Sequence, residues 1–278
     1  MRCIVVVLVS LFVGASAQSA SFRGLGSLPG GTFFSQAKGV SADGSFVVGK
    51  SASVSGTEAF LWDAVNGMQG LGDLPGSTFE SAAFDVSDDG SVVVGWGKST
   101  SSASGFEAFQ WDTSNGLQGL GDLSGGIFFS GALGVSADGT TIAGASASSS
   151  GILEAFTWDA NSGMQGLGDL PGGTFQSLST GISADAKIIV GQAVSAFGAE
   201  AFVWEAANGM RGLGDLSGGT FQSRAHAISA DGTTVVGQGS STLGVEAFRW
   251  DDNGGIQGLG ELPGGVGSIS CVFYTTGK

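Results

Sequence analysis

The strongest constraint on this chain is a phrase of eight residues that it repeats six times. The phrase reads Gly-Leu-Gly, then an acid or Ser, then Leu, then Pro or Ser, then Gly, then Gly or Ser. Its copies lie 46 to 49 residues apart and begin at Gly24, Gly70, Gly119, Gly166, Gly212 and Gly258. A fixed period of this length indicates a repeat architecture, so a residue type that recurs once per period is first of all a structural part.

Three further phrases follow in a fixed order within each period. They are Ser-Ala-Asp-Gly, as at 41–44, a short apolar run ending in Gly, as at 47–49, and Glu-Ala-Phe-x-Trp with an acid, as at 58–63. Asp-Gly and Asn-Gly pairs between apolar segments predict tight hairpin turns, because Gly accepts the positive φ that such turns require. The sequence therefore predicts four short strands per unit.

Four strands in about 47 residues is the size of a propeller blade. The 52 glycines and the lack of a sustained helical period argue against helices. We predict an all-β fold of the β-propeller type, with five complete four-stranded repeats and a partial sixth; a β-solenoid is the alternative. The units are expected at about 36–74, 80–123, 130–170, 176–216 and 222–262, with an irregular tail at 266–278.

The Phe and Trp of each Glu-Ala-Phe-x-Trp phrase are two residues apart, so they share one face of a strand. We expect these rings to fill the space between neighbouring blades, where burial of each stabilises the fold by about 1.5–3 kcal/mol. The phenylalanines are Phe60, Phe109, Phe156, Phe202 and Phe248, and the tryptophans are Trp62, Trp111, Trp158, Trp204 and Trp250.

The first 17 residues have the pattern of a secretory signal peptide, with an apolar stretch at 3–13 and Ala15-Ser16-Ala17 before the cleavage point. Its removal leaves Cys271 as the one cysteine of a single repeat domain at 18–278, so no intramolecular disulfide is expected. We predict a secreted protein, extracellular or periplasmic, with no transmembrane segment in the mature chain. A monomer is expected.

The formal net charge of −14 gives no basic footprint for nucleic acid. The acid of the repeated phrase is flanked by glycine carbonyls, and calcium prefers oxygen ligands. Calcium could therefore be held at Asp73, Asp122, Asp169, Asp215 and Glu261. The alternative is that each of these acids accepts backbone N–H groups at a turn. Because the spacing of known calcium loops is missing, we expect no cofactor and assign no catalytic residue.

Two residues depart from the repeat. His226 is the single histidine, and comparison of the repeats places it where others have Gly39, Asp85, Gly134 or Gly181. Trp96 is the one tryptophan outside the repeated position, which makes it a candidate for stacking against a ligand. Because the repeat does not require these two residues, either of them could belong to a functional site.

The joint pattern over residues 22–265 resembles the HAF-repeat family of bacterial extracellular repeat proteins. It combines Glu-Ala-Phe-x-Trp-Asp, Gly-Leu-Gly-Asp-Leu-Pro-Gly-Gly-Thr-Phe and Val-Ser-Ala-Asp-Gly. The family's His-Ala-Phe is Glu-Ala-Phe here, as at Glu58. The resemblance implies a secreted or surface-associated repeat protein and supplies no catalytic residues.

The sequence favours a secreted, non-enzymatic repeat scaffold for binding or adhesion, whose partner would be a surface glycan or a protein. One alternative is a propeller-type enzyme acting on extracellular polysaccharide. A second is a calcium-stabilised surface-layer or matrix protein. Non-repeated residues gathered at the mouth of a central channel would favour the enzyme, and repeated residues there would favour the scaffold.

Overall fold

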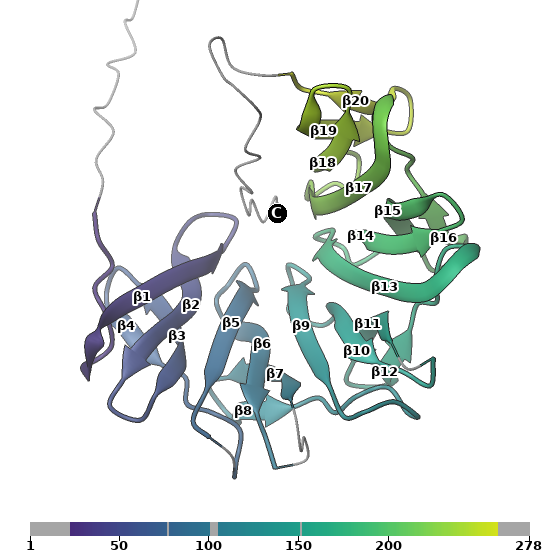
Figure 1. Ribbon diagram of the computed structural model, residues 1–278. Helices are drawn as coiled ribbons and strands as arrows, with labels where there is room; N and C mark the ends of the chain where they lie inside the picture. The colour runs from purple at the N-terminus through teal and green to yellow at the C-terminus, as the bar shows by residue number, and fades with distance from the viewer. Residues whose placement is uncertain (1–22, 77, 101–104, 151, 261–278) are drawn as a thin grey trace, which may run out of the picture.

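The structure is a computed structural model, and it describes residues 23–76, 78–100, 105–150 and 152–260. These residues form twenty strands and no helix. Figure 1 shows the strands as five units side by side around an arc, with the first strand of each unit nearest the centre. This arrangement confirms the predicted β-propeller type of fold. The predicted signal peptide, tail and partial sixth repeat lie outside the described residues.

Each unit, which we call a blade, has four antiparallel strands that follow one another in space as they do in the sequence. Blade one contains β1 (Gly30–Val40), β2 (Phe46–Ser53), β3 (Thr57–Asp63) and β4 (Gly67–Gly70). Blade two contains β5 (Ser81–Val86), β6 (Val92–Lys98), β7 (Phe106–Asp112) and β8 (Gly116–Gly119). Blade three contains β9 (Ser130–Val135), β10 (Ile142–Ala147), β11 (Leu153–Asp159) and β12 (Gly163–Gly166).

Blades four and five repeat the same order. Blade four contains β13 (Gly172–Ile182), β14 (Ile188–Ser195), β15 (Gly198–Glu205) and β16 (Gly209–Gly212). Blade five contains β17 (Gly218–Ile228), β18 (Val235–Ser241), β19 (Gly244–Asp251) and β20 (Gly255–Gly258). The first strand of blade one begins at Gly30, before the predicted unit start at 36, because the glycines of the repeated phrase already belong to the strand.

The Ser-Ala-Asp-Gly turns are held by their own side chains. Asp43 Oδ1 accepts hydrogen bonds from the Ser41 hydroxyl and the Ser45 backbone N–H, both at 2.8 Å, and Gly44 has a φ of 75°. In blade four Ala186 takes the glycine's place at a φ of 60°, the one positive value outside glycine among the described residues. The local turn chemistry therefore sets the register of the first two strands of each blade.

The first strand of every blade contains a bulge two residues before its end. In β17, Ala225 pairs with Gly237 and Ala227 pairs with Val236, which leaves His226 as the extra residue. The bulge residues are Lys38, Phe84, Leu133, Thr180 and His226.

The bulge corrects the predicted alignment of His226. It is Ala227, one residue later, that occupies the position of Gly39, Asp85, Gly134 and Gly181. His226 is equivalent to Lys38, so it belongs to a position that varies in every blade. The repeat comparison was wrong by one residue, since His226 lies three residues before Ser229 just as Lys38 lies three residues before Ser41. The pairing of the first two strands shows this equivalence directly.

The core lies between blades, as predicted from the paired rings. Phe156 is fully buried and packs with Val94 and Ala108 of blade two, and Trp158 lies partly buried beside it. Phe248 and Trp250 pack in the same way against Val190 of blade four. Blades two to five therefore each supply their aromatic face to the preceding blade.

A serine on the first strand fastens each blade to the one before it. Ser177 Oγ accepts a hydrogen bond from the Ala155 N–H at 3.0 Å and donates one to the Gly168 carbonyl at 2.6 Å. Its side chain is fully buried. The same two bonds recur at the equivalent serines, which we call joint serines: Ser81, Ser130, Ser177 and Ser223.

The glycine that ends the apolar run is required by close packing. A Cβ on Gly144 would lie 2.1 Å from the Gly131 carbonyl oxygen and 2.8 Å from the Phe156 ring. We expect Gly144→Ala to lower the free energy of unfolding by about 1–3 kcal/mol, because strand and ring must move apart. Chemical denaturation measures this. Gly131→Ala is the matched control, since its Cβ would meet only Trp96, at 3.7 Å; an equal loss in both variants would contradict the argument.

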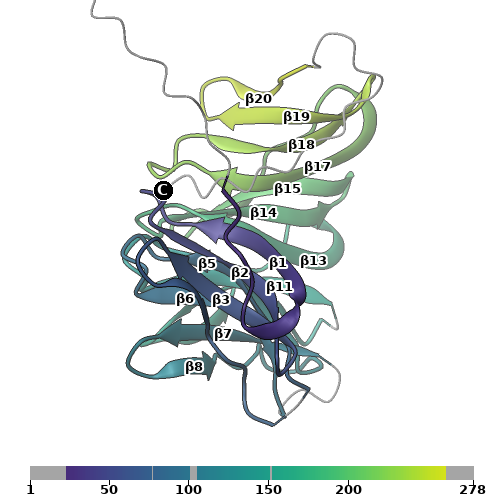
Figure 2. The same cartoon turned by 90° about the vertical axis from the view of Figure 1, so that its left-hand side faces the viewer.

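Blades one and five are the two ends of the arc. Figures 1 and 2 show β1 and β17 in the end blades, with the other three blades between them. The strand pairings between blades in the described residues join sequence neighbours, Thr57 with Glu80 and Ala199 with Gln222. Each end blade therefore has one face that no described blade covers.

Candidate functional site

The positions that differ from blade to blade lie on the two inner strands. One set is the bulge residues, and the other follows the packed glycine of the second strand. The second set is Lys50, Trp96, Ala145, Gln192 and Gln238. The position after the joint serine varies as well, being Gln36, Ala82, Gly131, Leu178 and Arg224. These positions of the inner strands differ between blades that share the same repeated phrases.

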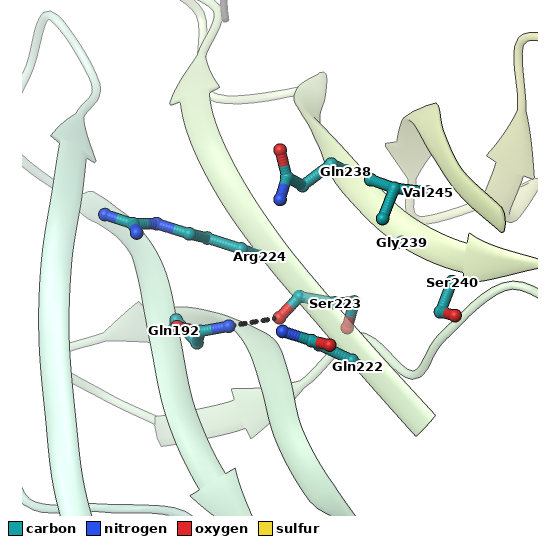
Figure 3. A pocket seen from close by; sticks show the side chains of 8 residues that line it. All are labelled: Gln192, Gln222, Ser223, Arg224, Gln238, Gly239, Ser240 and Val245. Carbon is teal, nitrogen blue, oxygen red and sulfur yellow. Dashed lines mark hydrogen bonds between the residues drawn. The ribbon is translucent and has the colours of Figure 1, made fainter. Parts of the chain in front are cut away.

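A polar cleft lies where the inner strands of blades four and five meet. Figure 3 shows it from close by. Its lining residues are Gln192, Gln222, Ser223, Arg224, Gln238, Gly239, Ser240 and Val245. Gln192 Nε2 donates a hydrogen bond to the Ser223 carbonyl at 2.9 Å, which fixes one wall to the other.

Arg224 supplies the charge of this cleft. In Figure 3 its guanidinium extends from β17 toward the side where Gln192 lies. Its Nε is buried and has no hydrogen-bond partner among the described residues, and none of the ion pairs between described residues includes it. None of the described residues that line the cleft has a carboxylate side chain. A cationic group surrounded by amides and a serine favours a ligand rich in oxygen, above all a carboxylate.

Asp215 lies beside the cleft, but its oxygens are already engaged. They accept the Gln222 N–H at 2.7 Å and the Ser240 N–H at 3.0 Å. This carboxylate therefore supports the cleft wall by accepting hydrogen bonds from its backbone N–H groups.

His226 adjoins the cleft through Gln238. Its Nε2 lies 3.2 Å from Gln238 Oε1. Burial lowers the pKa of His226; the hydrogen bond with Gln238 opposes that effect, and the positive charge of Arg224 adds to it. The imidazole is therefore neutral at pH 7, and it donates to an amide oxygen where a catalytic triad would have a carboxylate.

Trp96, predicted as a stacking candidate, is engaged by other rings. Its centroid lies 4.0 Å from that of Phe106 and 6.2 Å from that of Phe84. The Lys38 ammonium lies 5.7 Å from the Phe84 ring centroid. Burial lowers the pKa of Lys38, and the positive charge of Lys50 lowers it further. The ring of Trp96 is thus half-buried among the rings of blade two and lies beside Gly131 of blade three.

The acids predicted as calcium ligands lie at separate joints between blades. Asp73 accepts the Glu80 N–H at 2.7 Å, and Asp169 accepts the Gln176 N–H at 2.8 Å. Burial raises the pKa of Asp73, Asp122 and Asp169. Glu261 lies outside the described residues. Within the described part of the chain, no group of three or more His, Cys, Asp or Glu side chains is placed to hold a metal ion.

Two residues of the cleft, Arg224 and the joint serine Ser223, were not identified by comparing the repeats in the sequence. Arg224 lies where other repeats have Gln36, Ala82, Gly131 or Leu178, and a position that variable shows no motif. The joint serine, in contrast, recurs nine residues after the second glycine of Gly-Leu-Gly, as from Gly168 to Ser177. That regularity could have identified it.

Across the ranges that the structure describes, no helix is long and apolar enough to cross a membrane.

Comparison with known proteins supports the fold. No protein-family model matches the chain, and no curated protein matches it. A TolB-like protein of Agrobacterium tumefaciens aligns with a TM-score of 0.54 and 15% identity, over 82% of this chain and 81% of that one. TolB from Acinetobacter baumannii aligns with a TM-score of 0.50 and 13% identity, over 75% of this chain and 50% of its own length. At these identities the similarity establishes a shared propeller-like architecture.

Proposed function

We propose that this protein is a secreted, non-enzymatic repeat scaffold of the HAF-repeat type. In this proposal it acts at the cell exterior or in the periplasm and binds a carboxylate-bearing ligand in the cleft between blades four and five. The observation that carries the proposal is the Arg224 guanidinium, whose Nε is buried without a hydrogen-bond partner among the described residues in a cleft without carboxylates.

The use of the acids supports binding over catalysis. The aspartates of the turns and joints accept backbone N–H groups, as Asp43 and Asp215 do. Glu200 Oε1 accepts the Gly214 N–H at 2.9 Å, and Glu58, Glu107, Glu154 and Glu246 do the same in their own blades. These carboxylates support the strand ends rather than a reaction.

The varying inner positions also support the scaffold. Although non-repeated residues do gather on the inner strands, the bulge positions and the positions after the packed glycine contain no Asp or Glu. Polysaccharide hydrolysis commonly uses a pair of carboxyl groups. One acid on the inner strands departs from the repeat, Asp85, which is buried and accepts the backbone N–H groups of Val86 and Val135 at 2.9 Å. Non-repeated residues thus lie where an enzyme would have them, but the acid among them supports the backbone.

Removal of the Arg224 charge tests the proposal. We expect Arg224→Gln to weaken binding of an acidic oligosaccharide or acidic peptide by about 10-fold or more, because a charge-assisted hydrogen bond is worth about 1.5–3 kcal/mol. Calorimetric titration of the mature chain with both ligand sets measures this. Arg249→Gln is the matched control, since Arg249 is paired with Asp251 on the surface.

Three outcomes would count against the proposal. Equal affinity of the Arg224→Gln variant and the parent would place the ligand elsewhere. Failure of every acidic ligand to bind would remove the proposed ligand class. Turnover of a polysaccharide in a hydrolase panel would make the protein an enzyme.

A further inference from the structure

The Trp of the Glu-Ala-Phe-x-Trp phrase shares a core with the residue x of the preceding blade at two of the joints. Between blades four and five, Val203 and Trp250 belong to one apolar core. Between blades one and two, Leu61 belongs to the core against which Trp111 packs. Leu61 is 8% exposed and Val203 is 4% exposed, so apolar contacts close these two joints.

The joint between blades two and three differs, because its residue x is Gln110. Gln110 and Trp158 line a pocket of about 560 Å³ together with Thr140, Asp159 and Asn161. Thr140 lies in the turn between β9 and β10, and Asp159 and Asn161 lie at the turn between β11 and β12. We call this the acidic pocket. It shares no lining residue with the cleft between blades four and five.

The acidic pocket contains a carboxylate and an unused amide oxygen. Asp159 Oδ1 accepts the Asn161 N–H at 2.8 Å and the Ser162 N–H at 2.9 Å. The Ser162 N–H, followed by the Asn161 N–H, lowers the pKa of Asp159, so this group is an anion at neutral pH. Gln110 Oε1 is buried and has no hydrogen-bond partner among the described residues. None of the described residues that line the pocket is Lys or Arg.

The turn of blade three leaves the second oxygen of Asp159 without the amide that blade one provides. In blade one, Asn66 Nδ2 donates to Asp63 Oδ2 at 2.9 Å. In blade three, Ser162 has the position of Asn66, and the asparagine comes one residue earlier, at Asn161. The pocket therefore offers hydrogen-bond acceptors that a donor-rich ligand can use.

Blade five shows what the fold places over the equivalent tryptophan. The Arg211 guanidinium carbon lies 5.1 Å from the Trp250 ring centroid, and Arg211 Nη2 donates to Asp252 Oδ1 at 3.0 Å. Trp250 is 6% exposed as a result of this and its apolar contacts. For Trp158, the position of Arg211 is occupied by Gln118, which is exposed, and Trp158 is only half-buried. The chain thus provides no guanidinium of its own at this place.

We propose that the acidic pocket binds the guanidinium of an arginine side chain in a peptide or protein partner. The guanidinium would lie over the Trp158 ring, as Arg211 lies over Trp250, and donate to Asp159 Oδ2 and Gln110 Oε1. The terminal torsion of a glutamine is soft, so the Gln110 amide can turn its oxygen toward this ligand. Guanidinium is favoured over ammonium because it is planar, stacks on rings and has several fixed donors. This site has the opposite charge preference from the cleft at Arg224 and extends the proposed function.

Two peptides that differ in charge alone test the ligand class. Calorimetric titration of the mature chain compares acetyl-Gly-Arg-Gly-amide with the same peptide in which the neutral isostere citrulline replaces arginine. We expect the arginine peptide to bind about 5-fold more tightly or better, the contribution of a partly exposed ion pair. Equal affinity for the two peptides would overturn the proposal, and so would tighter binding of a neutral oligosaccharide. Arg224→Gln should leave the affinity unchanged; a loss would place the peptide in the cleft.

Removal of the carboxylate charge tests the location. Asp159→Asn keeps the Oδ1 acceptor of the turn and should weaken binding of the arginine peptide by about 5-fold. Asp112→Asn is the matched control, because Asp112 Oδ1 accepts the N–H groups of Ser114 and Asn115 at 2.8 Å in the same turn of blade two. Unchanged affinity of Asp159→Asn, or an equal loss in both variants, would contradict the proposed site.

Gln110→Leu separates binding from structure. It introduces the residue that blade one has at this position, Leu61. We expect weaker binding of the arginine peptide together with an unchanged or higher free energy of unfolding, because a buried acceptor without a partner is removed. Urea denaturation measures the second quantity. Unchanged affinity, or a loss of affinity that is accompanied by a loss of stability, would overturn the role of Gln110 in the pocket.

Discussion

Replacement of Phe156 by Ala should lower the free energy of unfolding by about 3–5 kcal/mol. The ring is fully buried between blades two and three, where it packs with Val94, Ala108 and Ile142. Its removal leaves a cavity that two rigid sheets cannot collapse to fill. Urea denaturation followed by tryptophan fluorescence measures the loss.

Phe197→Ala is the control for this experiment. Its side chain is 76% exposed, so the expected change is within about 0.5 kcal/mol. Phe156→Leu should lie between the two, since it keeps part of the buried volume. A loss for Phe156→Ala below about 1 kcal/mol would contradict the placement of the core between the blades.

Ser177→Ala should lower the free energy of unfolding by about 2–4 kcal/mol, a large effect for one hydroxyl. The substitution leaves the Ala155 N–H and the Gly168 carbonyl without their bonds to the serine. A buried polar group without a partner costs about 1–3 kcal/mol. The same denaturation assay applies.

Ser35→Ala is the matched control, because Ser35 has the same sequence position in blade one. It makes one of the two bonds, to Gly26, and it is exposed. We expect a loss below about 1 kcal/mol. Similar losses at Ser35 and Ser177 would show that the two-bond joint is not what holds the blades together.

The four strands of each blade could be predicted because their turns are local. Asp-Gly and Asn-Gly fix a hairpin within a few residues, and the glycines at these turns, such as Gly44 and Gly67, do have positive φ. The Phe and Trp rings of a blade could be placed on one face of their strand, because side chains two residues apart in a strand point to the same side. Both inferences need only the sequence near the residue concerned.

The candidate site could not be predicted in the same way. Gln192 and Arg224 belong to different blades and lie 32 residues apart in the sequence, so only the meeting of β14 and β17 brings them together. The equivalence of His226 and Lys38, in contrast, is within reach of the sequence, because each lies three residues before the serine of its turn. Contacts between blades, such as that of Gln192 with the Ser223 carbonyl, depend on how the blades pack, which the repeat period does not contain.

The sequence by itself determined the repeat, the strand order within a blade and the aromatic contacts between blades, because these depend on periods and turns that recur every 46 to 49 residues. Only the tertiary structure decided how the blades join and where the joints stop. The joint serines act between strands of different blades, and an identical Ser35 lacks its second bond because no described blade precedes it. A repeat unit specifies its neighbour's contacts, but its position in the arc decides whether those contacts are made.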